Sequence, residues 1–261
     1  MLDLSFLRNP RFGVASTAIS LASFALFGAS FACTQFLQDA LGYSALQAGA
    51  AMVPLAVGLM AGAATSVKLV PRLGVRGVVT IGLVGLAATM LACLGWSPDM
   101  PYWPLGLWFF AVAWSMGFVM SPATASVMGS VPSDKAGVAS AMNDVTREVG
   151  GALGTAVLGS LISSLYASRV AGSVTHLPAA VQDQAKDSIG MANAVAAHLG
   201  GTQGAQVRDA AASAFTEALG LGLAIAAACA VAAAVAVRLW LPSDAGAGAA
   251  EPIAGALPQP A

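Results

Sequence analysis

Six long runs of apolar residues divide this sequence, and each is long enough to cross a lipid bilayer as a helix. A helical span needs about 20 mostly apolar residues. The runs cover residues 12–37, 45–67, 77–95, 103–128, 145–166 and 214–241. Because a backbone in lipid must satisfy its own hydrogen bonds, and these runs do not alternate as barrel strands do, we predict an all-α membrane protein with six transmembrane helices.

The composition excludes several other classes of protein. Hydrophobic residues make up 57% of the chain and charged residues only 9%, against roughly a quarter charged in a soluble domain. The net charge of −1 gives no basic field for nucleic acid, so the bilayer is the expected partner. Neither paired carboxylates, a nucleophile motif, a phosphate loop nor metal-ligand spacing is present, which predicts no enzyme, no cofactor and no metal site.

The distribution of basic residues predicts which way the helices face. Arginine and lysine precede the first run, separate the second from the third and the fourth from the fifth, and close the sixth (Arg8, Arg11, Lys68, Arg72, Arg76, Lys135 and Arg238). The short loops after the first and third runs contain Asp39 and Asp99 and no basic residue. The positive-inside rule therefore predicts a multi-pass protein of the cell (inner) membrane with both termini in the cytoplasm.

The segments outside the runs predict a single membrane domain. Residues 1–11 form a cytoplasmic lead-in, residues 12–241 the membrane domain, and residues 242–261, rich in Ala, Gly and Pro, a disordered cytoplasmic tail. The long segment 167–213 lies outside the cell and is expected to hold one amphipathic helix from Pro178 to about His198. A glycine-rich break follows, and then a second helical stretch that continues into the last run.

Six helices with three in each half produce an inverted repeat. The first three and the last three runs enter the membrane from opposite sides. Transporter folds are often built this way, with the substrate site near mid-membrane between the repeats.

Four stretches of the chain resemble one transporter family. They are LDLSFLRNPRF at residues 2–12, LGYSALQAGAAMVPLAVG at 41–58, VPRLGVRG at 70–77 and VPSDKAGVASAMNDVTREVGGALGTAVLG at 131–159. Together they resemble the carboxyl-terminal half of the fourteen-helix drug/proton antiporter branch of the major facilitator superfamily. The resemblance implies half of a 3+3 transporter fold, a small-molecule substrate, and either a missing amino-terminal half or a second copy as partner, since members of that branch are about twice as long.

A charged cluster opens the fifth run. Asp144 lies three residues before Arg147, so the two can pair on a helix, and Asn143 and Glu148 flank them. Ionisable residues at membrane depth suggest function, but these lie close to the edge of the hydrocarbon layer. The cluster is therefore either a conformational gate at the cytoplasmic mouth or a structural ion pair at the interface.

Small residues and a proline suggest further conformational sites. Gly150 and Gly154 have GxxxG spacing, and Gly151 begins a second such row, which predicts a close helix crossing that either packs or rocks. Pro54 is expected to kink the second run near its middle.

The loop after the second run carries Lys68, Arg72, Gly74 and Arg76. These residues either fix the topology or interact with an inner gate.

Substrate contacts are predicted at Gln35 and Gln38, at the outer end of the first run, and at the deep aromatic residue Trp114.

The central third of each run contains no Asp, Glu, Lys, Arg or His. A proton relay needs titratable groups along its path, so any proton coupling must use residues outside this chain. We therefore expect proton-coupled efflux of drugs or small lipophilic metabolites by a larger or paired transporter, or else a truncated, non-transporting membrane interaction or assembly protein.

Overall fold

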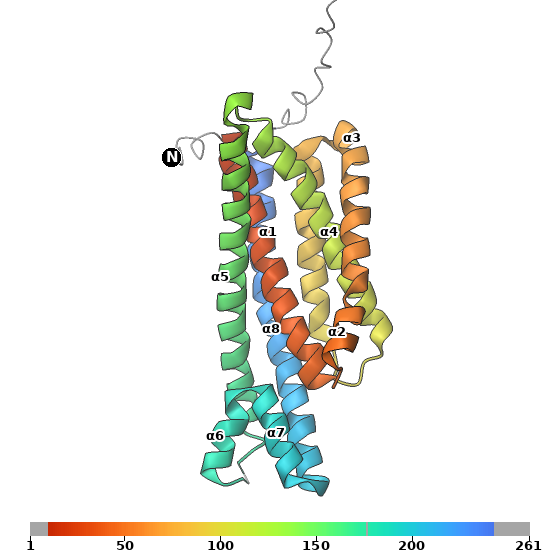
Figure 1. The fold of residues 1–261 in the computed structure, drawn as a ribbon, viewed down its shortest axis with the longest axis vertical. Coiled ribbons are helices and arrows are strands. Elements are labelled where there is room, and N and C mark those ends of the chain that lie inside the picture. The colour runs from red at the N-terminus through yellow and green to blue at the C-terminus, as the bar shows by residue number, and fades with distance from the viewer. Residues whose placement is uncertain (1–9, 176, 243–261) are drawn as a thin grey trace, which may run out of the picture.

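Long helices run side by side along one axis of the molecule and are joined by short turns (Figure 1). The computed structural model describes residues 10–175 and 177–242. Most of the predicted lead-in and the predicted disordered tail lie outside these residues. The helices are α1 (Pro10–Gln35), α2 (Ala45–Ala51), α3 (Val53–Ala92), α4 (Tyr102–Met128), α5 (Ala136–Val170), α6 (Ala179–Asp187), α7 (Ile189–Leu199) and α8 (Gly201–Trp240). A π-helical turn, Phe36–Ala40, follows α1. Short 3-10 turns follow α3 at Cys93–Gly95 and precede α5 at Ser133–Lys135.

Five helices in the described residues are long and apolar enough to cross a membrane, and one of them makes two of the six predicted crossings. The segment Ala45–Gly95 is 51 residues long and reverses at Gly74, whose φ of 70° and ψ of 163° are not helical. Only glycine adopts such angles without strain. Figure 1 shows α3 running to one end of the bundle and returning beside itself.

This reversal is the connection between the second and third runs, and it is shorter than the predicted loop. The chain remains helical on both sides of Gly74, so Lys68, Arg72 and Arg76 lie on the helical turns that flank it. We call residues 53–73 the first arm of α3 and residues 75–92 its second arm. The end of the bundle that contains this turn is called the Gly74 end.

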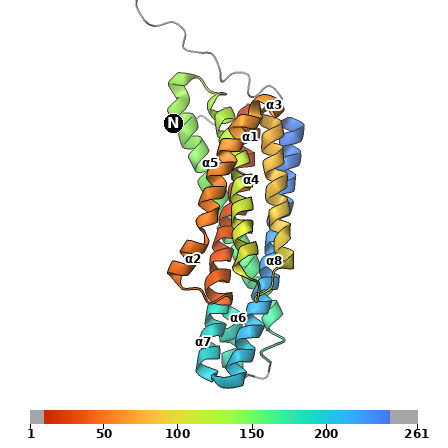
Figure 2. The same cartoon turned by 90° about the vertical axis from the view of Figure 1, so that its right-hand side faces the viewer.

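The opposite end carries α6 and α7 and is called the hairpin end (Figure 2). The prediction of one helix over this segment is wrong, because Ser188 is extended, with φ −161° and ψ 161°. Its hydroxyl accepts a hydrogen bond from the amide of Met191 at 3.2 Å, which starts a new helix there. Beyond Gly200, whose φ is 62°, α8 runs without interruption through the last crossing, as predicted.

Two pairs of helices make the most extensive contacts in the described part of the bundle. The two arms of α3 pack on α4, α1 packs on α5, and α8 contacts α1, α3 and α5. The ion pair between Arg169 of α5 and Glu217 of α8 joins two of these helices near the hairpin end.

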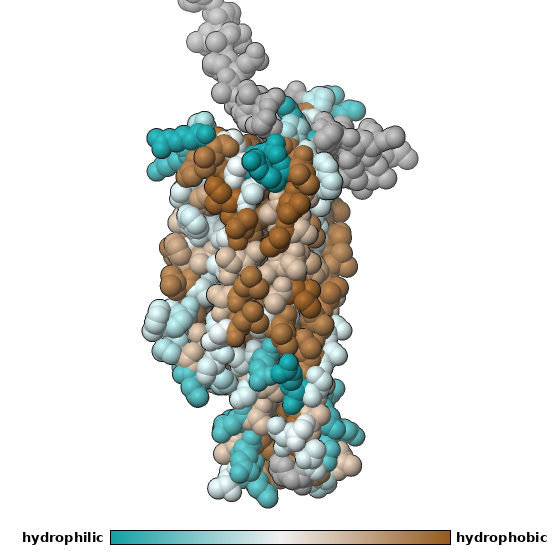
Figure 3. Space-filling view, turned by 180° about the vertical axis from the view of Figure 1, so that it is seen from behind, coloured by the Kyte–Doolittle hydropathy of each residue, from teal (hydrophilic) through white to brown (hydrophobic). Residues whose placement is uncertain are grey.

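One face of the molecule is an apolar belt (Figure 3). It is formed by α8 and the second arm of α3, with exposed side chains that include Ile81, Val84, Val231, Val235 and Leu239. Hydrophilic residues gather above and below it. An exposed apolar belt between polar ends matches the thickness profile of a bilayer, so this face is suited to lipid.

Candidate functional site

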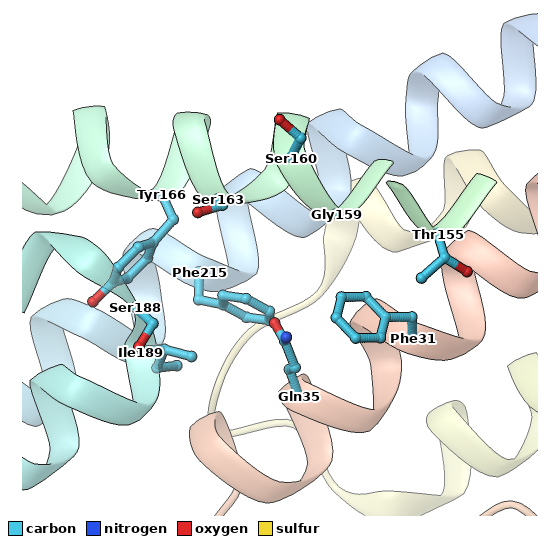
Figure 4. Close-up of a pocket in the computed structure, with 10 residues that line it drawn as sticks. All are labelled: Phe31, Gln35, Thr155, Gly159, Ser160, Ser163, Tyr166, Ser188, Ile189 and Phe215. Atoms are coloured by element: carbon cyan, nitrogen blue, oxygen red, sulfur yellow. The ribbon is translucent and has the colours of Figure 1, made fainter. Parts of the chain in front are cut away.

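A pocket of about 370 Å³ opens at the hairpin end between α1, α5, α7 and α8 (Figure 4). It is lined by aromatic, hydroxyl and amide side chains and by one glycine: Phe31, Gln35, Thr155, Gly159, Ser160, Ser163, Tyr166, Ser188, Ile189 and Phe215.

Helical spacing places these residues together. On α5, Thr155, Gly159, Ser163 and Tyr166 follow one another at three or four residues and so share one face of the helix. Phe31 and Gln35 are four apart on α1. A Cβ added at Gly159 would lie 3.3 Å from Cε1 of Phe31, so the missing side chain leaves room for the ring and for the pocket.

Three polar groups in the pocket are already used within the protein. The hydroxyl of Thr155 donates to the carbonyl of Gly151 at 3.1 Å, that of Tyr166 donates to the carbonyl of Ala185 at 2.9 Å, and that of Ser188 caps α7. The Tyr166 bond fixes α5 to the end of α6, which holds the hairpin against the pocket.

Three other polar side chains in the pocket make no hydrogen bond within the described residues. No side-chain hydrogen bond of Gln35, Ser160 or Ser163 occurs among residues 10–175 and 177–242. An amide and two hydroxyls supply both donors and acceptors. None of the ten lining residues is an acid, a base or a histidine, so the polar contacts that the pocket offers a ligand are neutral hydrogen bonds.

The structure separates the three residues predicted to contact substrate. Gln35 lines the pocket. Gln38 is exposed one turn further along, and Trp114 lies in α4 with its ring 4.5 Å from that of Phe118. The sequence prediction did not include the hydroxyls of the fifth run, although Thr155, Ser160 and Ser163 are conspicuous in an apolar helix.

The charged cluster lies in the first half of α5, the half nearer the Gly74 end (Figure 1). Glu148 precedes Thr155, the first pocket residue on this helix, by about two turns. Arg147 Nη2 pairs with Asp144 Oδ1 at 2.5 Å, as the spacing predicted. Glu148 is exposed, whereas Asn143 is 5% exposed and its Oδ1 accepts no hydrogen bond from the described residues. A gating role for the cluster stays a prediction.

The predicted glycine stripe forms the crossing between α5 and α1. A Cβ at Gly150 or Gly154 would overlap the carbonyl oxygen of Ser20 or Phe24 respectively, and Gly151 faces the ring of Phe27. The glycines are therefore required for the close approach of the two helices. Their further role as a hinge stays a prediction.

Pro54 has a different setting from the one expected. It lies in the first turn of α3, directly after the break at Met52, where a helix needs no backbone N–H from it. The expected interruption of the second run is present as this break between α2 and α3, although the proline opens the second helix and does not bend a continuous one. A role for Pro54 in gating stays a prediction.

The basic residues around Gly74 also lie at the end opposite the pocket. Lys68 and Arg72 are exposed, and Arg76 is partly buried with its Nε unpaired within the described part of the chain. They do not contribute to the pocket.

More than half of the chain matches a known protein family. Residues 2–155 match the model of the Major Facilitator Superfamily. The chain belongs to this superfamily. The match covers the start of α1 to the glycine crossing on α5, and the helical architecture is that of half a major facilitator fold.

Several relatives in the superfamily are drug-efflux or resistance proteins. The chain is 31% identical to the multidrug efflux pump LfrA of Mycolicibacterium smegmatis over 84% of its own length and 43% of the relative's. It is 30% identical to the tetracenomycin C resistance and export protein of Streptomyces glaucescens, over 63% of this chain and 30% of that protein. For the multidrug resistance protein Stp of Mycobacterium tuberculosis the identity is 30%, over 70% of this chain and 33% of the relative.

These relatives are transporters and not enzymes, in agreement with the sequence prediction. The chain spans less than half the length of each of these curated relatives. As a member of the major facilitator superfamily with long apolar helices, it is a multi-pass membrane protein.

Proposed function

We propose that this chain forms half of a transporter that expels drugs or small lipophilic metabolites in exchange for protons. It acts within a larger protein, with a separately supplied amino-terminal half, or with a second copy. The observation that carries this proposal is the unpartnered face of α5. Val145, Val149, Leu153 and Val157, spaced four residues apart, are each about half exposed.

That face supports a partner within the membrane. Only 33% of the most apolar window of α5 is buried within the chain, the lowest share among the five long helices. The exposed row continues into small side chains at Ala152 and Ala156, and small residues favour helix contacts in lipid. The length of the curated relatives supports a second bundle in that position.

Proton coupling is assigned to the partner. Asp144, Arg147 and Glu217 lie before or near the first turn of the predicted crossings 145–166 and 214–241, and no ionisable residue falls in the central third of any predicted crossing. Carboxylates at mid-membrane depth would have to come from the other bundle.

The proposed orientation places the Gly74 end in the cytoplasm. Lys68, Arg72 and Arg76 gather there, and the positive-inside rule favours the cytoplasmic side for short basic connections. The hairpin end, with the pocket, then faces the exterior, and the protein resides in the cell (inner) membrane.

The test is drug accumulation in cells. Cells expressing this chain alone are expected to accumulate a fluorescent drug as control cells do. Co-expression with an amino-terminal six- to eight-helix half should lower accumulation, and a protonophore should restore it. Full proton-coupled extrusion by the lone chain would show that the assignment of the carboxylates to a partner is wrong.

A second candidate is a membrane interaction or assembly protein without transport. The same exposed face of α5 supports it, since a partner helix can pack on that face whether or not substrate moves. It becomes the better account if no supplied half restores extrusion although the two halves co-purify.

A further inference from the structure

We propose that the pocket at the hairpin end binds a neutral, planar aromatic molecule through its carbonyl and N–H or O–H groups, and discriminates against organic cations of the same shape. This inference rests on the proposed function, because it names the substrate class that such a transporter would meet at this end.

The size and the walls of the pocket suit a small polycyclic ring system. Its volume of about 370 Å³ is within the range of roughly 300–1,000 Å³ typical of small-molecule sites. Phe31 is 43% exposed and presents its ring to the pocket (Figure 4). On the other side, Tyr166 and Phe215 form an edge-to-face pair with centroids 6.2 Å apart, so a flat ligand has aromatic surface on both flanks.

The polar side chains without hydrogen-bond partners determine which polar groups the ligand must have at its edge. The Gln35 amide and the hydroxyls of Ser160 and Ser163 offer donors and acceptors, and no described residue uses them. A bound apolar ring would cover these groups and leave them without hydrogen-bond partners, which is unfavourable for each buried donor or acceptor. A ligand with both a carbonyl and an N–H or O–H group avoids that cost.

The absence of charge in the lining decides between neutral and cationic ligands. A cation over an aromatic ring is attracted by the ring, but removing the cation from water costs more than this attraction returns unless a carboxylate compensates. No lining residue is acidic. No lining residue is basic either, so an anion is equally disfavoured. The neutral ligand is therefore preferred.

Acridone and N-methylacridinium provide a matched pair of probes. They share one three-ring shape, both fluoresce, and only the second is charged. Binding to the full chain in phosphatidylcholine nanodiscs is followed by fluorescence anisotropy, with empty nanodiscs as the lipid background. Acridone is expected to bind at least about tenfold more tightly than N-methylacridinium.

Paired substitutions locate the binding. Gln35→Leu and Ser163→Ala should each weaken acridone binding about 2- to 10-fold, the range for one net hydrogen bond. Gln38→Leu and Ser164→Ala make the same changes at exposed neighbours outside the lining and should have no effect. Ser163→Asp should reverse the preference toward N-methylacridinium, and Ser164→Asp should not.

Two results would overturn the proposal. One is acridone binding that neither Gln35→Leu nor the near-isosteric Ser163→Ala weakens, with monodisperse protein in each case. The other is wild-type binding of N-methylacridinium that equals or exceeds that of acridone and is lost in Gln35→Leu. Either result leaves the transporter proposal intact, because it is judged by drug accumulation. Conversely, failure of extrusion with acridone still bound would defeat only the proposed function.

Discussion

Individual glycines determine how closely the helices of this molecule approach. Gly150 and Gly154 lie against backbone carbonyls of α1, and Gly58 and Gly62 lie in the same way against those of Phe110 and Trp114 in α4. The first pair was predicted from its four-residue spacing. The second pair has the same spacing but was not predicted as a crossing, since Gly58 lies four residues after Pro54, where the sequence indicates an interrupted helix.

A substitution at the α1–α5 crossing tests this requirement. In Gly154→Ala the new methyl group would overlap the carbonyl oxygen of Phe24, and overpacking of this kind costs about 1–3 kcal/mol. Gly137→Ala is the control, since Gly137 lies on the same helix with nothing within 4 Å of its added Cβ. Only Gly154→Ala should lower the stability.

The native cysteines can report that loss. Cys33 and Cys93 are buried, so a thiol-reactive dye labels them only when the bundle opens. With the half-buried Cys229 replaced by Ala, Gly154→Ala should lower the temperature at which labelling begins. Equal onset temperatures for the two variants would contradict the overlap.

Among the elements, the hairpin formed by α6 and α7 shows how a tertiary contact completes a short helix. The last carbonyls of a helix lack partners within it, and the hydroxyl of Tyr166 supplies one to Ala185, two residues before α6 ends. Tyr102 does the same for Ala51, the last residue of α2, at 2.9 Å. Neither contact was predictable from sequence, since each joins residues whose proximity is set by the packed bundle.

Removing each hydroxyl in turn tests its effect on one element without changing the other. Tyr166→Phe should raise amide hydrogen exchange across residues 179–199, with a local cost of about 1 kcal/mol for one net hydrogen bond. Tyr102→Phe should raise exchange across residues 45–52 and leave the hairpin unchanged. Mass spectrometry of the exchanged peptides measures both, and protection that is unaltered by Tyr166→Phe would exclude the proposed role of its hydroxyl.

For the whole molecule, hydropathy was sufficient to predict the number and order of the crossings. Long apolar runs leave a chain few alternatives to helices in lipid. The reversal at Gly74 shows the limit of that reasoning, because a single left-handed residue replaced the expected loop. The pocket could not be predicted from the sequence for another reason. It forms where α1, α5, α7 and α8 meet, whereas sequence spacing relates residues only within one helix. Of its lining, only Gln35 was named beforehand.

The path of the chain predicts opposite exposure of its two ends. In a variant without the three native cysteines, single cysteines at Arg72→Cys and Asp183→Cys should react from different sides of the membrane. A membrane-impermeant maleimide added to intact cells should label Asp183→Cys only. Lys68→Cys, on the same arm as Arg72, should behave like Arg72→Cys, and labelling of all three from outside would contradict the six crossings.

Because α8 is continuous, it moves as one rigid helix. Its 40 residues extend about 60 Å at 1.5 Å per residue, and they link the hairpin end to the Gly74 end without a proline. Tilting such a rod by a few degrees about its midpoint sweeps each tip sideways by roughly 2–3 Å. Phe215 lies only about five residues, or roughly 8 Å, from that midpoint, so the same tilt moves this wall of the pocket by less than about 1 Å. The tips of α8 can therefore follow a change in bilayer thickness while the pocket keeps its width.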